Sequence, residues 1–421
     1  KLIELKDSNS NKATFIYDDY GRITKKIYPE KNPDIYIYSD DLKSTAISSG
    51  GRGITKITDG FGRAVIIDNP PGEEDIKYEY YFGNKVSKIY KAKSSSSWQE
   101  IDSYIYDPYL RPAIKTNVYW GTIAYNYNDT NSENKFSVTT TTLPDQNGNI
   151  ITRTTETTLD KLGREISSKY LNTNNETTTG YDGFGNIVMI TDMRLQHKTE
   201  YNNYGEITKG FNTSAIGTNP TLASELKYFD NGLIEKVEIK DDGSHHKRYT
   251  YLYDNENRQT AIKVDGVTKE TRTYDEASGR NGKGRLTTAK NGQVETKYAY
   301  DNLGRTTDET TNILPIENGP KIEYKVQTLY NQNGYIEKVI YNDAKEIDYT
   351  YKTNNQRLDK IMYDTKQIAT YDYNPNGTIN KITFGSGITI DYEYEKEILL
   401  NKITAKKSNG DTIYEQSYGF D

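Results

Sequence analysis

Polar and apolar residues alternate along most of this chain, in short runs separated by turn-forming residues. Residues 22–27 (RITKKI) and 334–340 (GYIEKVI) are two such runs. Alternation with a period of two places the apolar side chains on one face of a β-strand, whereas an amphipathic helix repeats about every 3.6 residues. A helix-period stripe is missing from the sequence, so we predict an all-β protein with almost no helix.

The turns between these runs share a signature, Tyr-Asp/Asn-x-x-Gly-x, seen clearly at residues 298–305 (YAYDNLGR). Tyr298 and Tyr300 are two residues apart, so both side chains leave the same face of a strand. Asp301 is a turn former, and Gly304 supplies the positive φ that a short hairpin loop needs. We predict that the tyrosines pack in ladders and that Arg305 pairs across the hairpin.

The signature recurs along the chain. Its clear copies are residues 17–22, 181–186, 201–206, 300–305, 330–335 and 373–378, and its degenerate copies are 58–63, 106–111, 159–164, 253–258 and 274–280. From residue 159 onward the copies fall about every 20–25 residues, a period typical of stacked repeats with one hairpin each. We therefore divide the chain into an irregular hairpin region with insertions (1–158) and a regular repeat region (159–421), and we expect the two to form one continuous shell.

The number of hairpins has a consequence for the fold. The pattern implies more than about 30 strands, whereas open twisted sheets rarely exceed about 10 strands without curling or splitting. Successive hairpins that pair side by side accumulate twist. We therefore expect tandem β-hairpins in a long spiral antiparallel sheet that forms part of a hollow, barrel-like shell.

Composition supports an ordered protein with an unusual interior. Only 33% of the 421 residues are hydrophobic and 27% are charged, a balance that would raise the question of disorder were it not for 39 tyrosines. A tyrosine ring buries a large apolar area while its hydroxyl stays bonded or wet, and Tyr and Thr favour strands. We expect an aromatic, partly polar interior.

Charge and cysteine content exclude several classes of function. The net charge of −6, with both signs interspersed, disfavours nucleic acid and anionic membranes as partners. The chain has no cysteine, which excludes disulfides and thiolate metal sites, and no apolar run reaches the roughly 18–20 residues of a membrane span. The start lacks a signal region and the end resembles a repeat cut partway through, so we expect a fragment of a longer chain.

The chain resembles the RHS, or YD-repeat, family at these signatures. The resemblance rests on residues 17–22 (YDDYGR), 58–63 (TDGFGR), 181–186 (YDGFGN), 201–206 (YNNYGE) and 300–305 (YDNLGR). The family includes bacterial Rhs toxins, wall-associated proteins, the B and C components of Tc toxins, and the teneurins. Residues 58–106 look similar to the bacterial Tc and Rhs branch.

This resemblance implies a spiral β-sheet cocoon that, in the toxins, encloses a C-terminal effector until delivery. The expected function is a non-enzymatic shell segment of a secreted or surface-associated bacterial toxin. Its expected partners are an effector domain of the same or an associated chain inside the shell, other toxin subunits, and cell-surface glycans. The family's self-cleaving aspartate plug has no match here. Asp107-Pro108, the one Asp-Pro pair, lies inside a degenerate repeat, so a cleavage site would lie beyond residue 421.

Two clusters have the composition of metal sites, and we interpret both as turns. Asp145, Asn147, Asn149 and Glu156 match positions 1, 3, 5 and 12 of a calcium loop, but Ile150 stands where that loop needs glycine. Residues 241–246 (DDGSHH) bring two histidines next to carboxylates, yet adjacent histidines on a strand point to opposite faces. His197 stands alone. We predict no metal and no cofactor.

Catalytic motifs are equally weak. Residues 279–285 (GRNGKGR) are glycine-rich and basic but lack the spacing of a phosphate-binding loop, so we expect a long hairpin loop there. Sixty acidic residues offer many carboxylate pairs, and the sequence ranks none above another. We predict no catalytic residues and no enzyme activity. The alternative to a toxin shell is a cell-surface adhesion or carbohydrate-binding protein of teneurin or wall-associated type, and an enzyme embedded in a β-solenoid is a third hypothesis.

Overall fold

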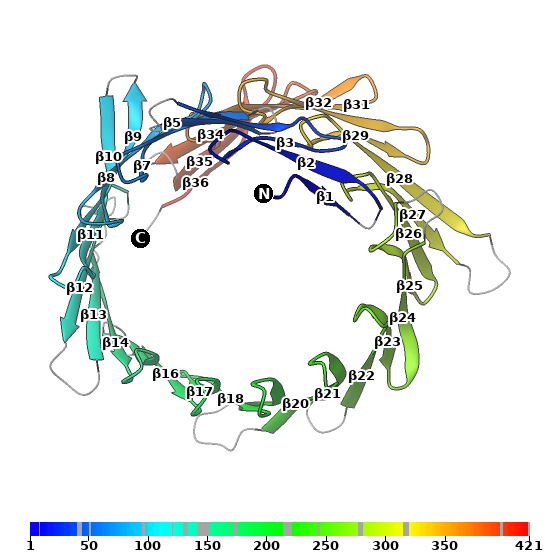
Figure 1. Ribbon diagram of the computed structural model, residues 1–421, viewed down its shortest axis with the longest axis horizontal. Helices are drawn as coiled ribbons and strands as arrows, with labels where there is room; N and C mark the ends of the chain where they lie inside the picture. The colour runs from blue at the N-terminus through cyan, green and yellow to red at the C-terminus, as the bar shows by residue number, and fades with distance from the viewer. Residues whose placement is uncertain are drawn as a thin grey trace. The chain divides into compact units, whose positions relative to one another are not determined.

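The computed structural model describes residues 1–419 except 8, 40–43, 50–51, 95–96, 120, 129–133, 142–151, 172, 174, 214–220, 242–244, 277–280, 315–319 and 396–398. Within these residues every regular element is a β-strand, and there are 36 of them (Figure 1). The predicted all-β fold of antiparallel hairpins is therefore confirmed, as is the expectation of more than 30 strands.

The chain forms two compact units, which are described separately. The first unit holds Lys1–Ser103, Tyr274–Thr288 and Gln293–Asp421, and the second holds Tyr104–Thr273 and Ala289–Gly292. Strands β10, β24 and β25 contain residues of both units. The predicted division at residue 158 follows repeat regularity rather than compactness, and it stays a prediction.

The N-terminal segment of the first unit contains β1 (Glu4–Lys6), β2 (Lys12–Tyr17), β3 (Ile23–Ile27), β4 (Asp34–Tyr38), β5 (Ser44–Ser49), β6 (Arg52–Thr58), β7 (Ala64–Asp68), β8 (Ile76–Tyr80), β9 (Val86–Ser94) and the beginning of β10 (Ser97–Tyr106). The first unit continues with β25 (Leu286–Asn291), β26 (Val294–Tyr300), β27 (Thr306–Ile313), β28 (Ile322–Tyr330), β29 (Ile336–Tyr341), β30 (Glu346–Tyr351), β31 (Leu358–Tyr363), β32 (Lys366–Tyr373), β33 (Ile379–Phe384), β34 (Thr389–Glu395), β35 (Leu399–Lys406) and β36 (Thr412–Ser417).

The strands between these two groups are β11 (Pro112–Asn117), β12 (Gly121–Asn128), β13 (Asn134–Thr141), β14 (Thr152–Leu159), β15 (Glu165–Tyr170), β16 (Asn175–Tyr181), β17 (Ile187–Thr191), β18 (Gln196–Tyr201), β19 (Ile207–Thr213), β20 (Thr221–Tyr228), β21 (Ile234–Asp241), β22 (His245–Tyr253), β23 (Gln259–Val264) and β24 (Val267–Tyr274).

Strands that follow one another in sequence pair antiparallel, so the sheet of each unit grows hairpin by hairpin. In the pair β26–β27, for example, Val294 lies opposite Ile313 and Ala299 opposite Asp308. The register then shifts by one residue, so that Tyr300 lies opposite Thr306. The same irregularity precedes Tyr201 and Tyr330. A β-bulge of this kind increases local twist, so each signature turn adds twist to its sheet.

The sheets are thinly covered. Among the described residues only Ala261 and Ala369 are apolar and buried, whereas the buried polar residues include Thr287 and Asn312. The accessible surface of the 48.1-kDa chain is 25947 Å². A compact monomer of this mass would expose about 16,500 Å². Solvent therefore reaches much of both sheet faces, and the interior that exists is largely polar, as the composition predicted.

In the part of the chain that the structure describes, no helix is long and apolar enough to cross a membrane. The spiral course and the enclosed hollow expected from the sequence stay predictions.

Candidate functional site

The signature turn is the recurring local structure of both units, and residues 300–305 illustrate it. One oxygen of Asp301, Oδ1, accepts hydrogen bonds from the backbone N–H groups of Leu303 and Arg305, each at 2.9 Å. The N–H of Gly304 donates to the Asp301 carbonyl at 3.1 Å. These bonds close the turn only if Gly304 adopts its φ of +83°, a conformation that glycine tolerates best. The predicted roles of Asp301 and Gly304 are confirmed.

The arginine at the end of the turn has two partners. Arg305 Nε donates to Asp301 Oδ2 at 2.5 Å, so the predicted pairing across the hairpin is confirmed. The guanidinium also lies over the ring of Tyr330 in the next hairpin, with its carbon 4.2 Å from the ring centroid. In the second unit, Arg111 lies 4.0 Å from the ring of Tyr127 in the same way. The arginine therefore joins its own turn to the following repeat.

The signature tyrosine makes the reverse connection, to the preceding repeat. The Tyr300 hydroxyl donates to the carbonyl of Leu286, the first residue of β25, at 2.5 Å. Other tyrosines at or next to the end of a strand make the same bond to the first residue of an earlier strand: Tyr38 to Ile23, Tyr80 to Ala64, Tyr181 to Glu165, Tyr201 to Ile187, Tyr228 to Ile207, Tyr330 to Thr306 and Tyr394 to Ile379. Each such hydroxyl therefore fixes one hairpin to the hairpin before it.

The turns also stack on one another, because the side chain that ends one turn lies against the glycine of the next. A Cβ on Gly304 would lie 2.7 Å from Arg285 Nη2, and a Cβ on Gly377 would lie 3.0 Å from Arg357 Nη2. In the second unit, a Cβ on Gly205 would lie 3.5 Å from Asn186 Oδ1. The glycine therefore serves two purposes, because it permits the positive φ and leaves room for the side chain of the preceding turn.

Asp59 and Asp182 are two turn carboxylates that are held ionised. The bond from the Arg63 side chain, together with the backbone N–H groups of Arg63 and Phe61, lowers the pKa of Asp59 below its ordinary value. The side-chain amide of Asn186 is the largest cause that lowers the pKa of Asp182. Burial raises the pKa of Tyr300 and Tyr330, so these hydroxyls stay protonated donors. Such electrostatics suit a permanent structural bond rather than proton transfer.

One face of the turn projects into solvent. The residue before the glycine is apolar in many copies and strongly exposed: Tyr20, Phe61, Leu162, Phe184 and Tyr204 are all at least three-quarters exposed, and Tyr204 reaches 89%. We call these side chains the exposed turn residues. An aromatic ring held in solvent by a rigid turn has the geometry of a stacking surface for a ligand.

A groove in the second unit lies beside one of these exposed turn residues. It has a volume of about 600 Å³ and lies between the turn at 202–206 and the turn that ends at Gly232. Tyr204, Tyr228 and Phe229 supply rings, while polar groups come from Asn202, Glu206, Lys227, Asp230, Asn231 and Glu235. Aromatic planes beside amides and carboxylates are the groups that recognise sugars.

A second depression, in the first unit, contains a carboxylate pair. Asp68 and Asp75 line a cleft of about 440 Å³ with Pro70, Pro71 and Glu73. Burial, the charge of Asp75 and a hydrogen bond to that carboxyl raise the pKa of Asp68. Asp75 Oδ1 also accepts from the Asn69 backbone N–H at 2.8 Å. Because Asp75 fixes the backbone of its own loop, we assign the pair to holding that loop.

The two clusters with the composition of metal sites, and His197, do not form a metal site among the described residues. Asp145, Asn147 and Asn149 lie outside the described residues, whereas Glu156 lies in β14 opposite Ser137 and Lys169. Residues 242–244 also lie outside them. His245 and His246 begin β22, and the His246 side chain is exposed. His197 Nδ1 lies 2.8 Å from Asn212 Oδ1. No group of three or more His, Cys, Asp or Glu side chains in the described ranges is arranged to hold a metal ion.

The other two motifs belong to turns. Residues 277–280 of the glycine-rich segment are outside the described residues, and the segment's end is a turn in which Arg285 Nη1 donates to the Asn281 carbonyl at 2.6 Å. Asp107 is the turn carboxylate of its repeat and accepts from Arg111 Nε at 2.7 Å. Neither the Tyr–carbonyl bonds nor the exposed turn residues were singled out from the sequence, although the apolar residue before each glycine was a visible signal for the latter.

No family model matches the chain, and no curated protein matches it. Solved structures similar to it include the TcdB2–TccC3–Cdc42 complex, at 12% identity and a TM-score of 0.40. The Tc holotoxin pore of Photorhabdus luminescens matches at 12% identity and a TM-score of 0.39. These matches cover 98% and 97% of this chain but 27% of each of those chains, so the chain spans about a quarter of their length. A porin-like protein from Bacteroides uniformis matches at 11% identity and a TM-score of 0.17, over 70% of this chain and 91% of its own.

Proposed function

We propose that the chain is a shell segment of a secreted or surface-associated bacterial toxin of RHS type, and that its role is to enclose an effector polypeptide rather than to catalyse a reaction. The observation that carries the proposal is the open sheet. Its accessible surface is about 1.6 times that of a compact protein of the same mass. A sheet whose faces are not covered by other parts of its own chain leaves those faces free to contact another polypeptide.

The chemistry of the sheet suits storage of a chain that has not folded. Tyrosine hydroxyls such as those of Tyr201 and Tyr300 are bonded to backbone carbonyls, and ion pairs such as Lys198–Glu200 (2.8 Å) are spread along the strands. A wall of rings interrupted by bonded polar groups offers a cargo many weak contacts. It offers few large apolar patches on which that cargo could fold or aggregate.

Limited proteolysis of the full-length gene product tests this role. We expect a protected fragment that derives from outside residues 1–421, and electron density that shows it within an unfilled space bounded by this sheet. A matched variant, Gly304→Val, strains a turn of this sheet and should make the same fragment protease-sensitive. If no fragment is protected and the density shows a filled core, the shell function is wrong.

A second candidate function, carbohydrate binding at a cell surface, is favoured by a different observation. The groove beside Tyr204 combines an almost fully exposed ring with Asn202, Glu206 and Glu235. Sugars bind proteins by stacking on such rings and by hydrogen bonding to such amides and carboxylates.

A glycan array probed with residues 1–421 distinguishes the two functions. An adhesin gives a defined set of bound glycans, and Tyr204→Ser removes that binding while Phe61→Ser, a matched exposed turn residue in the other unit, leaves it unchanged. Absence of binding by the wild-type chain would reject the adhesin function and leave the shell function standing.

A further inference from the structure

The first unit contains a contact between segments that are 272–301 residues apart in sequence. We call it the polar seam. On one side it consists of Asp7, Asn9, Glu30, Asn32, Pro71 and Glu73, and on the other side of Lys283, Arg285, Asn302, Gln332, Asn333, Asn354 and Arg357. The two sides run in the same order. The chain therefore returns alongside its own beginning, one repeat after another.

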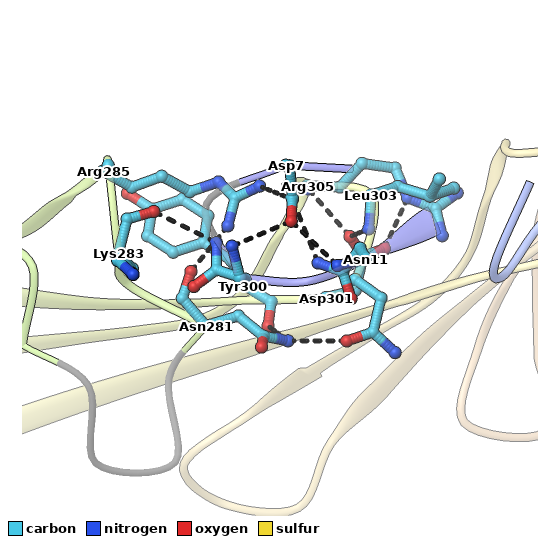
Figure 2. A network of polar contacts seen from close by, with 12 residues as sticks. Asp7, Asn11, Asn281, Lys283, Arg285, Tyr300, Asp301, Leu303 and Arg305 are labelled. Atoms are coloured by element: carbon cyan, nitrogen blue, oxygen red, sulfur yellow. Dashed lines mark hydrogen bonds and ion pairs between the residues drawn. The ribbon is translucent and has the colours of Figure 1, made fainter. Parts of the chain in front are cut away.

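The first contact of the seam joins the loop after β1 to the turn before β25. Arg285 Nη2 donates to Asp7 Oδ2 at 3.2 Å, and Asn9 Nδ2 donates to the Lys283 carbonyl at 3.0 Å. Figure 2 shows Asp7 and Arg285 facing each other above the turn at 300–305. Asp7 also accepts from the backbone N–H of Asn11 at 2.9 Å, which fixes the carboxylate for the ion pair.

The second contact joins the loop between β3 and β4 to two signature turns. The Glu30 carboxylate accepts from both the side chain and the backbone N–H of Asn302. The Asn32 backbone N–H donates to the Gln332 carbonyl at 2.6 Å, and Asn32 Nδ2 donates to Asn333 Oδ1 at 2.8 Å.

The third contact joins the loop between β7 and β8 to the turn before β31. Asn354 Nδ2 donates to the Pro71 carbonyl at 2.8 Å. Glu73 lies between two arginines, with Arg52 Nη2 at 2.5 Å and Arg357 Nη2 at 3.7 Å. The Glu73 side chain is only 10% exposed, so this end of the seam is the most enclosed of the three.

The bonding across the seam differs in kind from the bonding within the sheet. The ladder between β27 and β28 pairs six residues of each strand. Across the seam, one backbone-to-backbone hydrogen bond occurs among the described residues, between Asn32 and Gln332, and the remaining contacts involve side chains. Partly exposed side-chain pairs exchange readily with water, whereas a ladder opens only when a whole strand separates.

We propose that the polar seam is a reversible joint, at which the beginning of the chain separates from the repeats at 283–357 while every hairpin keeps its own ladder. When the first unit begins to open, it would therefore open along this line of turns. If the shell function holds, this line is where an enclosed polypeptide would gain an exit. The joint itself requires no cargo, so its test is independent of that function.

Thiol crosslinking measures the joint directly, because the chain has no cysteine of its own. The seam reporter is the double variant Asn32→Cys/Asn333→Cys, crosslinked with a short bismaleimide that tolerates some variation in thiol separation. The matched control is Thr296→Cys/Thr311→Cys, two cross-strand residues of the β26–β27 ladder whose hydroxyl oxygens lie 3.1 Å apart. A second seam pair, Asn9→Cys/Lys283→Cys, gives an independent reading if the first pair perturbs folding.

Both pairs should crosslink in native buffer. As urea rises, the yield of the seam pair should fall at least threefold at a concentration where the control yield and the far-ultraviolet circular dichroism are still native. Loss of both yields at the same urea concentration would overturn the proposal, because the seam would then open only with the sheet. Failure of both seam pairs to crosslink in native buffer, with the control crosslinked, would also overturn it.

Discussion

The same turn occurs in two different environments in this protein. In the first unit, the turn at 301–305 is covered: Glu30 bonds Asn302, and the Leu303 side chain is half-buried. In the second unit, the turn at 202–206 is uncovered, and Tyr204 projects into solvent. The internal bonds are alike, because Asn202 Oδ1 accepts from two backbone N–H groups at 2.9 and 3.0 Å, as Asp301 Oδ1 does.

The comparison distinguishes the residues that the conformation of the turn requires from the residue that contacts the surroundings of the turn. The carboxylate or amide, the glycine and the tyrosine hydroxyl are local requirements, and both turns meet them. The residue before the glycine meets what lies outside the turn: Leu303 is half-buried in the turn that the seam covers, whereas Tyr204 is 89% exposed. Four predictions test this separation.

The largest effect should come from the glycines. Gly304→Val and Gly205→Val each force a β-branched residue to a φ of +83° or +80°, which costs roughly 1–3 kcal/mol. Gly304→Val should cost more, because its Cβ displaces the Arg285 guanidinium and with it the bond to Asp7. Urea unfolding of the two variants measures the difference. Equal losses of unfolding free energy would mean that the contacts covering the turn at 301–305 do not contribute to its stability.

The tyrosine hydroxyls should come next. Tyr300→Phe leaves the Leu286 carbonyl without its donor in a half-buried position, and should cost about 1–2 kcal/mol. The matched change Tyr201→Phe exposes the Ile187 carbonyl to water and should cost about 0.5 kcal/mol. Thermal unfolding of both variants gives the comparison. A larger loss for Tyr201→Phe would show that burial does not set the strength of this bond.

Acidification should have a smaller effect on both environments. Burial opposes ionisation of Asp7, but bonds from Asn11, Asn9 and Arg285 hold its pKa below the ordinary 3.8, and the Asn186 amide does the same for Asp182. A lowered folded-state pKa stabilises the fold above the unfolded-state pKa, and this stability is lost as the pH falls through the folded-state value.

The urea midpoint should therefore be constant from about pH 7 to 5 and should decline below about pH 4. Asp7→Asn should reduce that decline and should also weaken the seam at neutral pH, because it removes the charge that Arg285 bonds. Asp182→Asn should reduce the decline with little change at neutral pH, since an amide retains an acceptor for both turn N–H groups. A decline that begins well above pH 5 would exclude these carboxylates as its cause.

The smallest effect on stability should come from the exposed turn residues. Tyr204→Ser should change the free energy of unfolding by no more than about 0.5 kcal/mol, as is usual for exposed positions. Leu303→Ser, the same position under the seam, should cost about 1–2 kcal/mol because its apolar contacts are lost. Differential scanning calorimetry of the pair gives the answer. Equal costs would indicate that Tyr204 is covered in solution.

The sequence predicted the elements of this fold and the chemistry of its turns. Alternating residues indicated strands, and the signature located the turn of Tyr300, Asp301, Gly304 and Arg305, because these features depend on neighbours a few residues apart. The hydroxyl bond from Tyr300 to Leu286 was not predicted. A period of two assigns a side chain to a face but says nothing about which carbonyl its end reaches.

The seam was beyond sequence reasoning for a different reason. Asn32 and Asn333 are ordinary loop residues, and nothing in either segment indicates the other. Their contact depends on the accumulated twist of the intervening hairpins, to which each register shift contributes. Small errors in that twist move the meeting point by a whole repeat, so the partner of Asn32 could be found only from the structure.

The sequential pairing of strands also determines how this protein can fold. Among the described residues the ladders join strands adjacent in sequence, as in β26–β27 and β28–β29, so hairpins can form locally and add to one another as the chain leaves the ribosome. Each hydroxyl bond such as Tyr330 to Thr306 couples only nearest neighbours, which makes growth resemble a zipper. Asn32 must wait for about 300 further residues before its partner exists, so the seam forms only after the hairpins between its two sides have been made.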